Sequence, residues 1–261
     1  MEVQHRTKKY NSWPAWSSEL DDLRKLGARV EKLANDRIED FVAEYERNAT
    51  DKRSDSDKER TKRYIRNGLR VSAEFLDGDD EVQGPIPDVL NELDRRTTRQ
   101  LSFKVDASHV PTMNGERIVL SFSRKKEGNS VELEVQSSDP GWARQALTIL
   151  SEEVEKGVPK WARARTRAGQ FLVALAVAVP TVIIAALLFP SHWPAWQRVL
   201  VGLIPATVVA CITVMPEIIS WLFPSFEITS DSGGSTGGRR IAAALALVAS
   251  VPLGIVVNLI T

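Results

Sequence analysis

Three long apolar segments in the last third of the chain constrain its fold more than any other feature. They cover residues 168–189, 199–223 and 241–260, and Glu217 is the only charged residue within them. A helix needs roughly 20 mostly apolar residues to cross a hydrocarbon core of about 30 Å. The pattern therefore predicts a bundle of three transmembrane helices, with the lipid bilayer as a partner.

The charged residues divide the chain into unlike parts. The sequence has 34 Lys and Arg and 34 Asp and Glu, and nearly all of them precede residue 168. The zero net charge is an average over these parts, so it says nothing about an acidic or basic partner. We expect a helical region at residues 1–84, an α+β module at 85–158, a basic link at 159–167 and the bundle at 168–261. The predicted fold class is an α+β cytosolic domain followed by a three-helix transmembrane bundle.

Basic residues flank the first and third apolar segments. Because Lys and Arg are enriched on the cytoplasmic side of membranes, they predict a cytoplasmic N-terminus and an external C-terminus in the plasma membrane. Phe223 and Phe226 fit the aromatic belt at the inner interface. The basic side chains are also candidates for binding anionic lipid headgroups. They are Lys156, Lys160, Arg163, Arg165, Arg167, Arg239 and Arg240.

Small residues recur every four positions in the second and third apolar segments. Residues four apart share one face of a helix, and small ones let two helices approach closely in lipid. They predict helix packing, either within the chain or between copies of an oligomer. The residues are Gly202, Ala206, Ala210, Ala242, Ala246, Ser250 and Gly254.

Each apolar segment also contains proline. Pro180, Pro205, Pro216 and Pro252 remove helical hydrogen bonds and favour kinks, which are candidate hinges. Glu217 directly follows Pro216, and ionisable residues inside membranes are candidates for ion conduction or gating. A carboxylate near a segment end can also simply reach the headgroups. Both interpretations stay open at this stage.

Two helices are expected in the N-terminal region. Apolar residues three or four positions apart predict one helix at residues 18–48 and a second at 57–76, paired as a hairpin. Arg37 interrupts the heptad pattern of the first helix, which favours packing within the chain over a coiled coil between chains. The mixed charges of residues 51–70 favour a solvated helix face over nucleic-acid binding.

The sequence pattern changes to an α+β unit after residue 85. A short helix is expected near residues 88–93, followed by alternating strands around 101–105, 118–122 and 131–135. Asp139 and Pro140 form a strong helix start, and the helix is expected to end near Gly157 with Trp142 on its buried face. The economical arrangement is a three-stranded antiparallel meander covered by this helix.

No catalytic, cofactor or metal motif is recognisable in the sequence. His5, His109 and His192 are far apart, and Cys211 is the only cysteine. The acidic cluster at residues 77–81 lacks the ligand spacing of a calcium loop, and no phosphate-binding glycine loop is present. We therefore expect a protein that is not an enzyme and has no cofactor.

The sequence thus favours a regulatory or effector protein. We expect the cytosolic module to bind a protein or small ligand, and the basic segment 156–167 to couple that event to the bundle. The alternatives are a structural anchor or scaffold for a partner, a pore-forming or channel subunit, and an enzyme whose site is unrecognisable.

Overall fold

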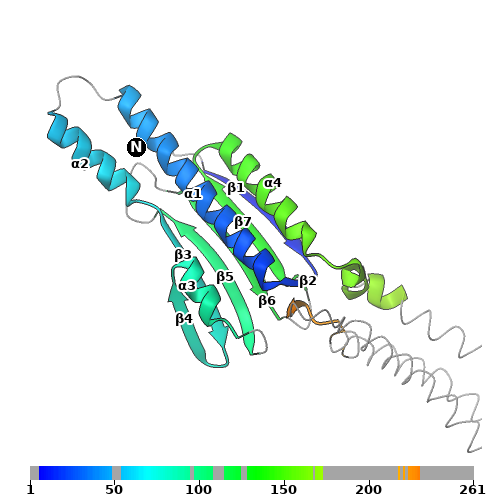
Figure 1. The fold of residues 1–261 in the computed structure, drawn as a ribbon. Coiled ribbons are helices and arrows are strands. Elements are labelled where there is room, and N and C mark those ends of the chain that lie inside the picture. Colours follow the sequence, from blue (N-terminus) through cyan, green and yellow to red (C-terminus); the bar gives the residue numbers. More distant parts are fainter. Residues whose placement is uncertain are drawn as a thin grey trace, which may run out of the picture. The chain divides into compact units, whose positions relative to one another are not determined.

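The computed structural model describes most of the first 172 residues and a short segment near residue 225 (Figure 1). The described residues are 6–48, 54–94, 97–107, 115–124, 128–166, 168–172, 217, 220 and 223–229. The chain divides into two compact units. Unit 1 comprises residues 1–125, 129–159 and 225–230, and unit 2 comprises residues 126–128, 160–224 and 231–261.

Unit 1 contains both strands and helices. Its strands are β1 (Thr7–Trp13), β2 (Trp16–Glu19), β3 (Arg70–Asp77), β4 (Asp80–Gly84), β5 (Thr98–Asp106), β6 (Arg117–Ser123), β7 (Val131–Ser137) and β8 (Phe226–Thr229). Its helices are α1 (Leu20–Asn48), α2 (Asp55–Arg66), α3 (Ile86–Glu92) and α4 (Pro140–Lys156).

Six of the strands form an antiparallel sheet in the order β1-β7-β6-β5-β3-β4. The three strands expected from the alternating pattern are present as β5, β6 and β7. The expected meander is nevertheless too small, because β1, β3 and β4 extend the sheet on both sides. The second expected helix is also too long, since α2 ends at Arg66 and residues 70–77 form a strand.

The reason for the error at β3 lies in its pairing. Val71, Ala73 and Phe75 alternate with polar neighbours, and β5 provides the backbone hydrogen bonds that a strand requires. Gly78 has a positive φ of 65°, so it suits the tight turn into β4. These features outweigh the helical spacing of the same apolar residues.

The expectation of a transmembrane bundle is wrong for the structure described. Among the described residues, no helix is long and apolar enough to cross a membrane. The fold class is accordingly an α+β fold with a six-stranded, mostly antiparallel sheet and helices. Most of the segments 168–189, 199–223 and 241–260 lies outside the described residues.

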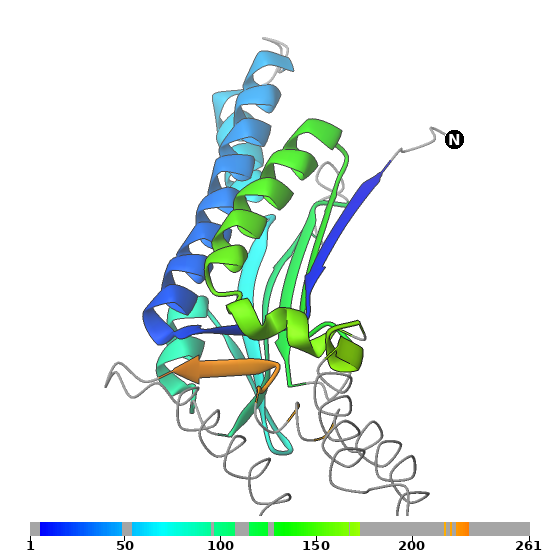
Figure 2. The same ribbon diagram turned by 90° about the vertical axis from the view of Figure 1, so that its right-hand side faces the viewer.

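Helices α1, α3 and α4 pack on one face of the sheet (Figures 1 and 2). The core between the two layers contains Leu101, Phe103, Leu120 and Leu133 from the central strands, each fully buried. Helix α1 contributes apolar residues to the same core and contacts α2, so it packs within its own chain. At least one face of this amphipathic helix is thereby covered.

A two-stranded parallel sheet joins the start and the late part of the chain. Strand β2 pairs with β8 in the register Trp16 to Phe226. Phe226 is fully buried, and its ring centroid lies 5.4 Å from that of Phe122. The Ser130 hydroxyl lies 2.9 Å from the Ser225 carbonyl oxygen. Phe226, expected at a membrane interface, is therefore a core residue of unit 1.

Unit 2 is described only in part. It includes a 3-10 helix at Lys160–Arg165 and the residues around Phe223. The Trp161 and Phe223 rings lie 5.2 Å apart, and the Arg165 guanidinium donates to the Phe223 carbonyl oxygen. Burial lowers the pKa of Arg165. This arginine, a candidate for lipid headgroups in the sequence, is 8% exposed.

Candidate functional site

The face of the six-stranded sheet opposite the helices is mostly polar, and we call it the open face. Its residues occupy the strand positions that alternate with the buried core residues. Except for Ser102, they are exposed or half-buried. The open face consists of Lys8, Tyr10, Ser12, Arg70, Ser72, Glu74, Leu76, Glu81, Gln83, Gln100, Ser102, Lys104, Asp106, Arg117, Val119, Ser121, Ser123, Glu132, Glu134 and Gln136.

Charge is distributed unevenly along the strands of the open face. One row across the sheet, read from the strand register, is Lys8, Gln136, Arg117, Asp106 and Arg70. Lys104 lies two residues before Asp106 on β5. We call Lys8, Arg70, Lys104 and Arg117 the basic end. The opposite end of the face carries Glu74, Glu81 and Glu132 and no basic residue.

Some of these charges are already paired. Lys8 lies 2.9 Å from a carboxylate oxygen of Glu134, and Lys104 forms an ion pair with Glu74. Asp106 lies directly between Arg70 and Arg117 in the register. Yet within the part of the chain that the structure describes, neither arginine forms an ion pair with it. Among the described residues, the two guanidinium groups are the cations of the basic end that have no ion-pair partner.

Two adjoining hollows lie at the basic end. The smaller, of about 200 Å³, is lined by Arg70, Ser72, Gln83, Lys104, Val105, Asp106 and Arg117. The larger, of about 330 Å³, is lined by Arg6, Asp106, Ala107, Gly115, Glu116, Arg117 and Gln136. Asp106 and Arg117 line both hollows. Ligand pockets in proteins usually measure about 300–1,000 Å³, so the larger hollow is at the lower end of that range and the smaller hollow is below it.

Gly115 lets Arg6 approach the larger hollow. Gly115 has a φ of 109°, a conformation that favours glycine. A Cβ atom at this position would lie 2.9 Å from Nε of Arg6, which is too close for an ordinary contact. A residue with a side chain at position 115 would therefore strain the backbone and push Arg6 away from the hollow.

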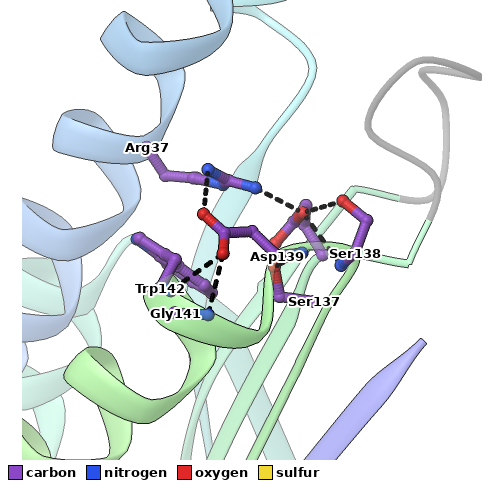
Figure 3. A network of polar contacts seen from close by, with 7 residues as sticks. Arg37, Ser137, Ser138, Asp139, Gly141 and Trp142 are labelled. Atoms are coloured by element: carbon purple, nitrogen blue, oxygen red, sulfur yellow. Dashed lines mark hydrogen bonds and ion pairs between the residues drawn. The ribbon is translucent and has the colours of Figure 1, made fainter. Parts of the chain in front are cut away.

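A buried polar network lies next to the larger hollow (Figure 3). The Arg37 guanidinium donates to Oε1 of Glu116 at 3.0 Å and lies 3.7 Å from a carboxylate oxygen of Asp139. The Ser138 hydroxyl donates to the same Glu116 oxygen at 2.9 Å. The Arg37 guanidinium also lies 5.2 Å from the Trp142 ring centroid. The network joins α1, the start of β6 and the start of α4.

Asp139 caps α4 as the sequence predicts. Its carboxylate accepts hydrogen bonds from the backbone N–H groups of Gly141 and Trp142, at 2.8 and 3.3 Å. This local prediction is confirmed because it depends only on neighbouring residues. The pairing of Arg37 with Glu116 was not predicted. Arg37 stood out in the sequence only as an interruption of the heptad pattern.

Only a few of the other site residues expected from the sequence lie within the described part of the chain. Lys156 lies 2.8 Å from Glu153 on the surface of α4, and Lys160 and Arg163 are exposed in the 3-10 helix. Glu217 is exposed, and its carbonyl oxygen accepts a hydrogen bond from the Ser220 hydroxyl. The remaining candidates lie outside the described residues. They are Arg167, Pro180, Gly202, Pro205, Ala206, Ala210, Pro216, Arg239, Arg240, Ala242, Ala246, Ser250, Pro252 and Gly254.

The described residues give no catalytic or metal arrangement. All three histidines and Cys211 lie outside them. Within the described ranges, no group of three or more His, Cys, Asp or Glu could hold a metal ion. The charged and polar side chains of the open face can support recognition by charge and hydrogen bonding.

Sequence reasoning missed the open face, although a signal for it exists. The strand positions between the apolar residues of β5 and β6 are Ser102, Lys104, Val119 and Ser121, and they share one face by alternation. The register that places Arg70 beside Asp106 requires β3, which the sequence pattern assigned to a helix.

Comparison of the chain with protein family models, curated proteins and solved structures finds no match.

Proposed function

We propose that unit 1 is a non-catalytic binding module of a regulatory or effector protein, with the open face as its binding surface. One observation carries the proposal. Three helices cover one face of the sheet, while the other face has no described helix over it and has two hollows at its basic end. The partner would be a protein or a small ligand.

A solvated sheet face is not in itself a functional site, because many antiparallel sheets leave one face to water. The open face differs from a merely solvated one in its charge distribution. Its basic end has two arginines that form no ion pair with any described residue, and its other end is acidic. The helical layer holds the strands of both arginines in place. Rigid strands hold side chains in place better than loops do, which suits recognition.

A scaffold that holds a partner without transmitting a signal is the second candidate. It is favoured by strand β8, which fixes residues 226–229 to the core of unit 1. The hypothesis of a pore-forming subunit depended on the three expected transmembrane helices. It is therefore not proposed for this fold.

Site-specific crosslinking tests the binding surface. In a Cys211→Ala background, purified full-length protein with Ser121→Cys on the open face would be labelled with a photoreactive maleimide and added to permeabilised cells of the native host. Gln145→Cys, on the exposed side of α4, is the matched control. We expect a discrete adduct of the probe at position 121 that is absent at position 145.

The adduct should also disappear when unlabelled full-length protein is added in excess, because a specific surface saturates. Equal adducts at positions 121 and 145, or no adduct at position 121, would contradict the proposal. Retention of the adduct in a variant with an altered open face, such as Gln100→Arg, would also contradict it.

A further inference from the structure

We propose that the basic end of the open face binds an oxyanion group, a phosphate or a carboxylate, of a small ligand. Arg70 and Arg117 would be its principal contacts, and Lys104 would add a third positive charge. The inference rests on the proposed function, because it names the ligand class for the same face.

The positions of the two arginines favour this chemistry. Arg70 starts β3 and Arg117 starts β6, and both lie opposite Asp106 on the strand between them. Residues opposite each other on neighbouring strands have Cβ atoms about 4.5–5.5 Å apart. Two guanidinium groups thus flank one short stretch of β5. Each presents planar paired donors that match the oxygens of a phosphate or carboxylate.

The arginines also have hydrogen-bonding capacity to spare. Both are exposed, and within the described ranges neither forms an ion pair or a hydrogen bond through its side chain. Lys104 already pairs with Glu74. It would therefore contribute positive charge to the site and would not be a hydrogen-bond donor reserved for the ligand. Ser72 and Gln83 add neutral polar groups to the lining of the smaller hollow.

The sizes of the hollows suit a small ligand. The smaller hollow, of about 200 Å³, has room for a single anionic group. The larger hollow shares Asp106 and Arg117 with it and has about 330 Å³ for the rest of the ligand. Arg6 lies at this second hollow and adds a further positive charge.

Asp106 provides an internal test, because its negative charge lies between the two arginines. If the site holds an anion, the Asp106 carboxylate repels it, and neutralising the carboxylate should tighten binding. If the anion binds elsewhere on the protein, neutralising Asp106 should change the affinity no more than the distant control variant does. The inference thus predicts opposite changes for neighbouring residues of the same row.

Calorimetric titration of the purified full-length chain tests the inference, with pyrophosphate and citrate as probes at constant ionic strength. We expect at least one probe to bind. Binding of pyrophosphate alone would identify a phosphate site, and binding of citrate alone a carboxylate site. The double variant Arg70→Ala/Arg117→Ala should weaken binding by at least about 30-fold, because it removes two charge-assisted contacts.

The control is Arg60→Ala/Arg144→Ala, which removes the same charge from exposed positions on α2 and α4. It should change affinity by no more than about two-fold, since salt screens distant charges. Asp106→Asn should raise affinity by about three- to ten-fold. If Arg70→Ala/Arg117→Ala fails to fold, Arg70→Lys/Arg117→Lys keeps the charge and should still weaken binding by losing the paired donors.

Three results would overturn the inference: no binding of either probe, an equal loss in the control variant, or weaker binding with Asp106→Asn. The calorimetric test of the anion site can be distinguished from the crosslinking test of the binding module. Crosslinking at position 121 without anion binding would contradict the anion site and still support the binding module. Failure of both experiments would contradict both proposals.

Discussion

Arg37 and Glu116 show how a single pair of residues can join three elements. Arg37 is 8% exposed and Glu116 is 2% exposed, so their ion pair is largely shielded from water. Removing one member of a buried pair leaves an uncompensated charge and costs about 3–5 kcal/mol. Replacing both members with apolar residues is much less costly, because no charge then remains buried.

We therefore expect Arg37→Met and Glu116→Leu each to lower the free energy of unfolding substantially. The double variant Arg37→Met/Glu116→Leu should lose much less than the sum of the two single losses. Chemical denaturation of the full chain measures all three. Additive losses would show that the two side chains contribute independently and would contradict the described pairing.

At the start of α1, Asp22 provides a prediction that depends on pH. The Ser18 hydroxyl, which donates to the Asp22 carboxylate, lowers the pKa of Asp22 below its ordinary value of 3.8, and Lys25 adds to this effect. A carboxylate with a lowered folded pKa stabilises the fold above its ordinary pKa. This stabilisation is lost as the pH falls through the lowered value.

Ser18→Ala should consequently destabilise the protein at pH 7 by less than about 1 kcal/mol, because the group is partly exposed to solvent. The difference from wild type should shrink as the pH falls below the ordinary pKa of Asp22. Denaturation at several pH values measures this. With Asp22→Asn in the background, Ser18→Ala should show no such pH dependence, and a persistent dependence would contradict the assignment.

At the scale of elements, α4 shows which part of a sequence prediction survives packing. Its start at Asp139 and Pro140 and its end near Gly157 agree with the sequence. Trp142 differs from the expectation, because it is only half-buried and packs against the edge of the core near Arg37. The buried face of α4 consists of Ala143, Ala146, Leu150 and Val154.

Trp142→Ala should therefore cost less than the about 3–5 kcal/mol typical of a fully buried tryptophan. Leu150→Ala, at a fully buried position, should cost about 2–5 kcal/mol and exceed it. Thermal or chemical unfolding of the two variants shows which substitution lowers the free energy of unfolding more. A greater loss for Trp142→Ala would mean that the tryptophan is more deeply packed than described.

Strand β8 is an element whose importance lies in distant contacts. Phe226 packs against Trp16 and Phe122, more than 100 residues away along the chain. We expect Phe226→Ala to lower the free energy of unfolding of unit 1 by about 3–5 kcal/mol, as a large truncation in the core. Thr229→Ala, at the half-buried end of the same strand, is the control and should have a small effect. Equal effects of the two variants would contradict the described packing.

At the scale of the whole molecule, the division into units changes the expected route of coupling. The sequence suggested that only residues 156–167 connect the module to the rest of the chain. Residues 225–230 also belong to unit 1. The chain therefore passes between the two units after residues 159, 224 and 230, and also on both sides of residues 126–128. A flexible insertion after Pro159 would therefore leave other covalent connections intact.

The location of the protein in the cell stays a prediction at this scale. The sequence places it at the plasma membrane with a cytoplasmic N-terminus, and residues 173–216 and 230–261 lie outside the described part of the chain. Fractionation of native host cells, with detection of the full-length chain, measures the location. We expect the protein to sediment with the membrane fraction, and its recovery in the supernatant at low and high salt would contradict the prediction.

The sequence by itself determined the features that depend on neighbouring residues. Alternation in residues 101–105, 118–122 and 131–135 identified three strands, and Asp139 with Pro140 identified the start of α4. The helical spacing in residues 18–48 identified α1 in the same way, because each of these patterns reflects which side chains share one face.

Tertiary structure alone decided the features that depend on distant partners. Strand β1 has a mostly polar sequence, so its place at the sheet edge follows from pairing with β7, more than 100 residues later. The pairing of β3 with β5 overrode a helical pattern, and β8 is held by residues near the opposite end of the chain. The open face also arises only from strand register. Arg70, Asp106 and Arg117 lie in one row because backbone hydrogen bonds align their strands, which no local pattern specifies.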